Sequence, residues 1–298
     1  MSNWAAKFQA IVADLNPVHA KFLARAFSNL SSENSDELGR YVDYCAKDGI
    51  TIEYLAECYN LIVTDTQIEQ IYFKRNKRYR CSTFKEVADA VYFSNTYMPR
   101  YMHGLALTTF LWPNHLAMRD FFVKTFPAGT RGEYLEIGPG HGYYFTKASA
   151  LGSFDFMTGI DISASSVALT RKMLQHFAVD RDKVKILEAD FLQFDPGVLF
   201  SCIVMGEVLE HVERPELFLE KIAKLAEEDT YIYITTAVNS PAIDHIYLFR
   251  SSEEVEQLMR KCGLEITDKL CLPHPGVTLE EAYARAMSVN VAYVARKL

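Results

Sequence analysis

Apolar and polar residues alternate with a helical period over the first 126 residues. Apolar side chains recur every three or four positions in residues 7–15, 19–27, 35–46 and 51–63. This spacing places them on one face of a helix, so each segment is predicted to be helical, with Ser35 as a candidate N-cap. A longer apolar helix is expected from about Met102 to Phe126, with Pro113 as a candidate break.

The period changes near residue 127, where apolar strand-like runs begin to alternate with amphipathic helices. The runs cover residues 133–138, 156–161, 184–189, 200–206, 230–237, 264–272 and 290–297. Helical patterns lie between them at residues 145–152, 163–177, 215–228 and 251–263, and a partly helical segment at 278–287 joins the last two strands. Such alternation predicts an α/β fold whose mostly parallel sheet is buried on both faces. We therefore expect a helical part at 1–126 and a sheet domain at 127–298.

Composition narrows the class of protein. Hydrophobic residues make up 49% of the 298 residues, charged residues make up 23%, and the formal net charge is −7. A negative balance argues against a nucleic-acid partner. No apolar run is long enough to span a membrane, and six cysteines without metal spacing fit a reducing cytoplasm.

A glycine-rich loop follows the first predicted strand. It begins at Glu136 and has glycines at positions 138, 140 and 142. Glycines at such a turn allow backbone to approach a ligand closely. The dinucleotide fingerprint GxGxxG would require a glycine at position 143, where this chain has Tyr143.

The pattern E-x-G-x-G-x-G resembles the first motif of class I S-adenosylmethionine-dependent methyltransferases. Four further segments resemble that family in the same order: Asp161 after the second strand, Asp190 and Phe191 after the third, residues 206–212 after the fourth, and the segment with His245 after the fifth. The resemblance implies a Rossmann-like seven-stranded sheet with an antiparallel last strand. It also implies S-adenosylmethionine as cofactor, with Asp161 on the ribose and Asp190 on the adenine. The cofactor-binding set is then Glu136, Gly138, Gly140, His141, Gly142, Asp161, Ile162, Asp190, Phe191 and Glu207.

Glu207, Glu210 and His211 follow the fourth strand and are candidate catalytic residues. In a helix they would share one face. An imidazole in general titrates near neutral pH, so His211 is our candidate general base, with a glutamate in support and His245 nearby. An alternative reading is that His211 only packs beside the adenosyl group.

The Glu-x-x-Glu-His pattern also resembles the magnesium cluster of some quinone-pathway O-methyltransferases. Glu207, Glu210, His211 and His245 would then be ligands of a divalent metal. A metal is not expected, because similar Glu-His sequences occur in many methyltransferases that bind none.

The helical N-terminal part is expected to cover the cofactor site and to contribute an aromatic pocket. Candidate substrate-binding residues are Tyr97, Tyr101, His103, His115 and Tyr143, although helix packing explains several of them equally well. The basic run at residues 74–80 fits either an anion site or a solvated turn. The segment before it weakly resembles a winged-helix dimerisation module of some O-methyltransferases, which suggests a homodimer.

These features together predict methyl transfer to oxygen, nitrogen or activated carbon of a small-molecule metabolite, in specialised natural-product biosynthesis. A protein or peptide methyltransferase and a metal-assisted enzyme for a hydroxy- or 2-oxo-acid are the alternatives. RNA methylation, or a binding protein that has lost transfer, fit the residues less well.

Overall fold

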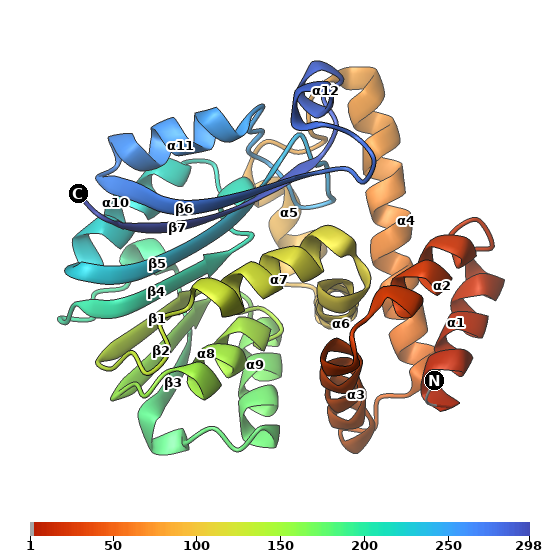
Figure 1. The fold of residues 1–298 in the computed structure, drawn as a ribbon, viewed down its shortest axis with the longest axis horizontal. Coiled ribbons are helices and arrows are strands. Elements are labelled where there is room, and N and C mark those ends of the chain that lie inside the picture. Colours follow the sequence, from red (N-terminus) through yellow and green to blue (C-terminus); the bar gives the residue numbers. More distant parts are fainter. Residues whose placement is uncertain (1–2) are drawn as a thin grey trace.

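A seven-stranded sheet forms the centre of the molecule. The computed structural model describes residues 3–298, and the strands lie in the order β3-β2-β1-β4-β5-β7-β6 (Figure 1). Their bounds are β1 Glu133–Ile137, β2 Phe156–Asp161, β3 Val184–Glu188, β4 Phe200–Gly206, β5 Ala226–Val238, β6 Leu264–Pro273 and β7 Val289–Lys297. Strands β1 to β5 pair in parallel, and β7 is antiparallel to both β5 and β6. This is the predicted Rossmann-like methyltransferase topology, including the antiparallel last strand.

Helices cover both faces of the sheet (Figure 1). One face packs on α10 (Pro215–Leu225), α11 (Ser252–Lys261) and α12 (Leu279–Ala284). The other packs on α7 (Pro113–Thr125), α8 (Tyr143–Leu151) and α9 (Ala164–His176). Short 3₁₀ turns follow β3 at η3 (Phe191–Gln193) and β4 at η4 (Leu209–His211), and another, η2 (Arg181–Lys183), directly precedes β3. Because both faces are covered, the strands are nearly continuous apolar runs.

The N-terminal helices form a cap beside the carboxyl ends of the strands. They are α1 (Asn3–Leu15), α2 (Ala20–Asn29), α3 (Ser32–Lys47), α4 (Ile52–Asn76), α5 (Phe84–Val87), the π-helical turn η1 (Ala88–Tyr92) and α6 (Tyr97–Leu111). Their apolar faces build a separate core that extends to Tyr143 and Met173 of the sheet domain. The cap is therefore packed onto the sheet domain and is not a loosely tethered unit.

Three details differ from what the sequence predicts. Helix α3 begins one turn early, because the side chain of Ser31, and not of Ser35, accepts the N-cap hydrogen bond from the Asn34 backbone at 3.1 Å. The helix expected to reach residue 228 ends at Leu225, and the chain then enters β5. No strand is assigned within residues 3–126, so the cap lacks the β-wing of a winged-helix module.

The expected break at Pro113 is confirmed. Helix α6 ends at Leu111, Trp112 is extended, and Pro113 begins α7, where its missing N–H costs no hydrogen bond. Helix α7 packs on the sheet through Met118 and Phe122. The boundary at residue 126 stays a prediction, since one helix of the N-terminal part is built into the sheet domain.

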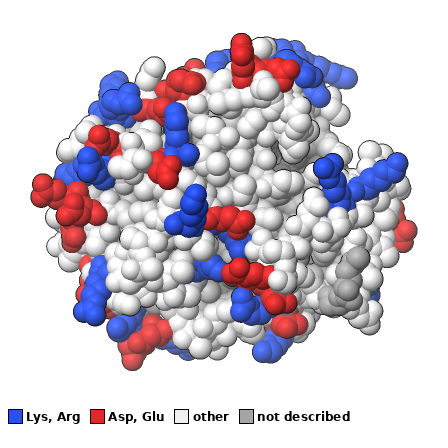
Figure 2. Space-filling model, in the orientation of Figure 1, with Lys and Arg blue, Asp and Glu red and all other residues white. Residues whose placement is uncertain are grey.

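Acidic and basic side chains are interspersed on the face of the molecule that Figure 2 shows, and no broad patch of either sign forms there. Within residues 3–298, none of the helices combines the length and apolar character that a membrane span requires.

Candidate active site

A cavity of about 530 Å³ lies where the strand ends meet the cap. It is lined by the loops after β1, β2, β3, β4 and β5 and by residues of α4, α6 and α7. Ligands of open α/β sheets bind at this edge, and this volume is typical of a small-molecule site. Residues of the strand ends and of the cap therefore line one and the same cavity.

The glycine loop brings backbone to the wall of this cavity. Gly138 has a φ of 68° and Gly140 a φ of 56°, in the left-handed region that favours glycine. A Cβ atom at Gly138 would lie 2.8 Å from Val208 Cγ2, and one at Gly140 would lie 3.1 Å from Met102 Sδ. The loop can hold this path only without side chains at the two positions.

Asp161 ends β2 beside the glycine loop. Its Oδ2 atom accepts a hydrogen bond from the Gly140 backbone N–H at 3.1 Å, and Oδ1 accepts one from Ser163 at 2.9 Å. Burial raises the pKa of Asp161 to about 6, although these backbone bonds act in the opposite direction. The carboxyl is thus tied to the loop and lines the cavity next to Ile162.

Asp190 and Phe191 follow β3 and line the same end of the cavity. The Oδ1 atom of Asp190 accepts a hydrogen bond from the Leu192 backbone at 2.8 Å, which fixes the side chain at the start of a 3₁₀ turn. Phe191 is buried against Phe218, with ring centroids 5.5 Å apart. A carboxylate beside an apolar ring suits a purine with an exocyclic amino group.

Glu136, His141 and Gly142 differ in their position. Glu136 lines the cavity but accepts a hydrogen bond from the Tyr134 hydroxyl, and burial raises the pKa of Glu136 to about 8. His141 lines the cavity and is half-buried, so it does not simply face solvent, and burial lowers its pKa to about 4. Gly142 lies outside the lining, where its hydrogen faces Thr170 of α9.

Glu207, Glu210 and His211 do not lie together in an α-helix, the condition under which they would share one face. Glu207 has a φ of 52° and precedes a single 3₁₀ turn from Leu209 to His211, because its backbone N–H is held by Thr235 of the neighbouring strand at 3.1 Å. One turn is too short for the shared helical face that the spacing suggested.

The two glutamates nevertheless lie together. Burial raises the pKa of both Glu207 and Glu210, and the Glu207 charge raises that of Glu210 further. The Oε2 atom of Glu210 accepts a hydrogen bond from Thr236 at 2.7 Å, whereas Oε1 of each glutamate is buried without a donor. One proton held between the two carboxyls would satisfy both unpaired oxygens.

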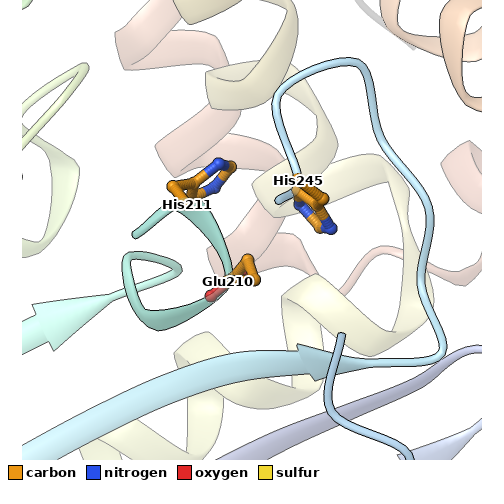
Figure 3. Close-up of side chains that lie close together, drawn as sticks. All are labelled: Glu210, His211 and His245. Atoms are coloured by element: carbon orange, nitrogen blue, oxygen red, sulfur yellow. The ribbon is translucent and has the colours of Figure 1, made fainter. Parts of the chain in front are cut away.

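Two histidines complete this part of the site (Figure 3). Nδ1 of His211 lies 3.1 Å from the Asp244 carbonyl oxygen, and Nδ1 of His245 lies 2.5 Å from the Ser240 carbonyl oxygen. Each contact needs a proton on Nδ1, so Nε2 of each ring is left as an acceptor. The two rings are 4.7 Å apart, and burial lowers the pKa of His245 to about 3.

Asp244 connects this pair to the cap. Its Oδ1 atom accepts a hydrogen bond from the Tyr101 hydroxyl at 2.9 Å, and Oδ2 accepts one from Tyr92 at 3.2 Å. The side chain is buried, and Oδ2 lies 3.4 Å from His211 Nδ1. Two cap tyrosines therefore bond to the residue that orients His211.

A family model described as a methyltransferase domain matches residues 114–269, just over half of the chain. The chain belongs to this methyltransferase family. The fold and the motifs assign the chain to the class I methyltransferases, whose cofactor is S-adenosylmethionine. The residues at the strand ends fit that molecule.

Individual relatives agree with this membership. The methyltransferase is 28% identical over 130 residues to a ubiquinone biosynthesis O-methyltransferase of Glaesserella parasuis, a match that covers 43% of this chain and 54% of that protein. It is 26% identical over 183 residues to the protein of the same name from a Chelativorans strain, covering 55% and 70%. The chain thus spans about half the length of the first of these relatives.

A solved structure supports the fold. One chain of a complex between the Haloferax volcanii Trm112 methyltransferase activator and a methyltransferase matches this protein with a TM-score of 0.53 and 15% sequence identity. The match covers 72% of this protein and 99% of that chain. At this identity the likeness shows the fold alone.

The methyltransferase places only part of the predicted substrate set at the cavity. Tyr101 and His115 line it, and His115 lies 3.0 Å from the Thr108 hydroxyl. Three predicted residues lie outside the lining because each is held elsewhere. Tyr97 donates to Asp65, His103 bonds to Tyr41, and Tyr143 donates to Glu37.

Asp65, Tyr92 and Asp244 are among the lining residues that the sequence analysis did not select. Asp65 interrupts an apolar helical stretch, and Asp244 directly precedes the selected His245, so both carried a signal. Tyr92 carried none, since aromatic residues in helices are more often core.

Proposed function

We propose that the protein transfers a methyl group from S-adenosylmethionine to an oxygen, nitrogen or activated carbon of a small metabolite, in specialised biosynthesis. The observation that carries this proposal is the single cavity that joins the cofactor strand ends to His211 and His245 under the helical cap. A cavity of this volume beneath a cap favours a small acceptor over a protein or peptide, which would need a long open groove.

Separate residues of the chain would bind the cofactor and accept the proton of the acceptor. Gly138 and Gly140 admit the methionyl end, Asp161 accepts hydrogen bonds from the ribose hydroxyls, and Asp190 with Phe191 holds the adenine. The bound cofactor supplies an electrophilic methyl on a sulfonium. His211 Nε2 accepts the proton that a hydroxyl or amine acceptor loses, while Asp244 holds the ring from Nδ1.

A metal-assisted reaction is the second candidate, and one observation favours it. Glu210, His211 and His245 each offer a ligand atom, and these atoms lie within 4.8 Å of one another (Figure 3). Two imidazoles suit zinc or another transition metal better than magnesium. This set contains three of the four predicted ligands and lacks Glu207. A metal held here would orient an acceptor oxygen.

Calorimetric titration with S-adenosylhomocysteine tests the cofactor part of the proposal. We expect binding of one molecule per chain, strong loss in Asp161→Ala, and nearly unchanged affinity in His211→Ala. Folded protein that binds no S-adenosylhomocysteine would refute the proposal. The metal-assisted alternative is tested by titrating Zn²⁺ and Mn²⁺ into EDTA-treated wild-type protein and, in parallel, into the His245→Ala variant.

His211 is tested by methyl transfer. Tritium from labelled S-adenosylmethionine is followed into low-molecular-weight products of a metabolite extract. We expect His211→Ala to lower turnover while S-adenosylhomocysteine affinity persists, and unchanged turnover would end its role as base.

A further inference from the structure

The cavity has a strong charge imbalance. Seven acidic residues line it: Asp65, Glu136, Asp161, Asp190, Glu207, Glu213 and Asp244. Among the described residues, Arg214 is the only lysine or arginine in the lining. The Arg214 side chain is 66% exposed and pairs with Glu216 at 2.8 Å, so it is already engaged at the rim.

Five of the seven acids already have an assigned role or a bonding partner in the site. Glu136, Asp161 and Asp190 lie at the strand ends assigned to the cofactor, and Glu207 is paired with Glu210. Glu213 accepts a hydrogen bond from the Phe84 backbone at 3.0 Å. A sixth, Asp244, holds His211 and accepts hydrogen bonds from two cap tyrosines, so Asp65 alone remains without an assigned role. Asp65 lies near Asp244, and both line the cavity.

Asp65 is half-buried in α4 and lacks a cationic partner. Its Oδ2 atom accepts a hydrogen bond from the Tyr97 hydroxyl at 2.5 Å, and no ion pair is found for it in the described part of the chain. Burial raises the pKa of Asp65, and the nearby Asp244 raises it further. The two carboxyls thus repel each other, and among the described residues no lysine or arginine forms an ion pair with either of them.

The walls around these carboxyls are aromatic and apolar. Tyr92, Tyr101 and Trp112 line the cavity, and Tyr97 stacks on Tyr101 with ring centroids 5.6 Å apart. The other walls are Ile62, Met98, Met102, Leu105 and Met118. Aromatic faces beside carboxylates attract an ammonium group and disfavour an anion.

We infer that the acceptor is a small aromatic or apolar amine whose ammonium group binds Asp65, with Asp244 beside it. This inference rests on the proposed function, and it argues against the hydroxy- or 2-oxo-acid acceptors considered from sequence. A carboxylate or phosphate would meet two carboxyls and no arginine or lysine that could pair with it. The ammonium serves recognition, and the methylated atom lies at the His211 end.

Three probes that share a 4-hydroxyphenylethyl group and end in a cationic, a neutral or an anionic group test the inference. They are 4-hydroxyphenethylamine, 4-hydroxyphenethyl alcohol and 3-(4-hydroxyphenyl)propanoate, each titrated calorimetrically into the protein saturated with S-adenosylhomocysteine. We expect the amine to bind about 10- to 100-fold more tightly than the acid, the factor that a hydrogen bond between charged groups supplies, with the alcohol between them. Asp65→Asn should remove most of the amine's advantage over the alcohol.

Glu57→Gln is the matched control, because Glu57 lies on the same helix but is exposed, outside the cavity lining and paired with Arg100. It should leave the order of the three probes unchanged. Equal affinity for the probes, or no binding of any, overturns the inference, as does a preference for the acid. An amine preference that persists in Asp65→Asn overturns the assignment to Asp65. Each result is distinct from failure of the proposed function, in which S-adenosylhomocysteine itself would not bind.

Discussion

Asp161 combines two opposing effects on one carboxyl. Burial raises its pKa to about 6, while backbone hydrogen bonds from Ser163 and Gly140 favour the charged form. A ribose diol needs the charged form as acceptor. We therefore predict that affinity for S-adenosylhomocysteine is constant above pH 7 and falls as pH drops below about 6, approaching tenfold per pH unit. Calorimetry between pH 5 and 8 measures this.

Asp161→Asn is the companion variant. Its affinity at pH 8 should be about 10- to 100-fold lower, because charge-assisted hydrogen bonds are lost, and the fall below pH 6 should vanish. A wild-type affinity that does not change from pH 5 to 8 would show that Asp161 does not titrate in the free protein.

His103 illustrates a histidine that packs and does not catalyse. It is 3% exposed and bonds to the Tyr41 hydroxyl at 2.8 Å, and burial lowers its pKa to about 4. The unfolded chain takes up the proton near pH 6.5, so the stability that neutral His103 contributes is complete above that pH and is lost as pH falls towards 4. Between pH 7 and 4.5 this loss amounts to about 2 kcal/mol.

His103→Gln removes the titration and keeps a polar partner for Tyr41. Urea unfolding at the two pH values should show that the variant loses about 2 kcal/mol less than wild type on acidification. His274→Gln, at an exposed position, is the control. An identical loss in His103→Gln and wild type would contradict the prediction.

At the scale of elements, the crossing of α4 and α6 depends on one glycine. A Cβ atom at Gly104 would lie 2.5 Å from the Cys58 carbonyl oxygen and 2.4 Å from Ile62 Cγ1. Backbone cannot move aside as a flexible side chain can. We predict that Gly104→Ala destabilises the protein by about 3 kcal/mol, although alanine favours helices. Chemical denaturation measures the change.

Gly39 provides the matched comparison within α3. It is also an interior helical glycine, but an added Cβ would meet nothing within 4 Å. Gly39→Ala should therefore stabilise the protein by up to about 1 kcal/mol. The same sign for both substitutions would show that close approach of α4 and α6 is not what Gly104 provides.

The strands were predictable from sequence, because each is a short apolar run. The functional residues at the end of a strand lie next to it in the sequence. Asp161 is the last residue of β2, Asp190 follows β3, and the glycine loop follows β1. The order of the strands along the chain was therefore enough to group them at one edge of the sheet. The cap was not predictable in this way. Tyr97, His103 and Tyr143 have the residue types of a pocket, but their partners Asp65, Tyr41 and Glu37 lie 32 to 106 residues away. Helical periodicity does not determine which distant side chain meets another.

At the scale of the whole molecule, Glu37 joins the cap to the sheet domain. This buried α3 residue accepts hydrogen bonds from the Tyr143 hydroxyl at 2.6 Å and from Lys147, and it lies 3.2 Å from Arg119 Nη2. Burial alone would raise the pKa of Glu37, but Lys147, Tyr143 and Arg119 hold it below its usual value. Three elements, α3, α7 and α8, therefore meet at one carboxylate.

Removing this carboxylate charge leaves the buried Arg119 with a single counter-charge, the exposed carboxylate of Asp120 at 3.5 Å. Arg119 is 3% exposed, and its Nε and Nη1 already lack partners. We predict that Glu37→Gln destabilises the protein by about 3 kcal/mol and raises amide exchange in α3 more than in β1 or β4. Asp36→Asn, one residue earlier and exposed, should change neither.

The contribution of Glu37 to stability also depends on pH. Because the pKa of Glu37 is lowered on folding, this contribution is present above about pH 4.5 and is lost as pH falls further. The stabilities of wild type and Glu37→Gln should therefore converge in acid. If amide exchange rose equally in α3 and the central strands, the cap and sheet would unfold as one unit, and Glu37 would stabilise the whole fold and not the attachment of the cap.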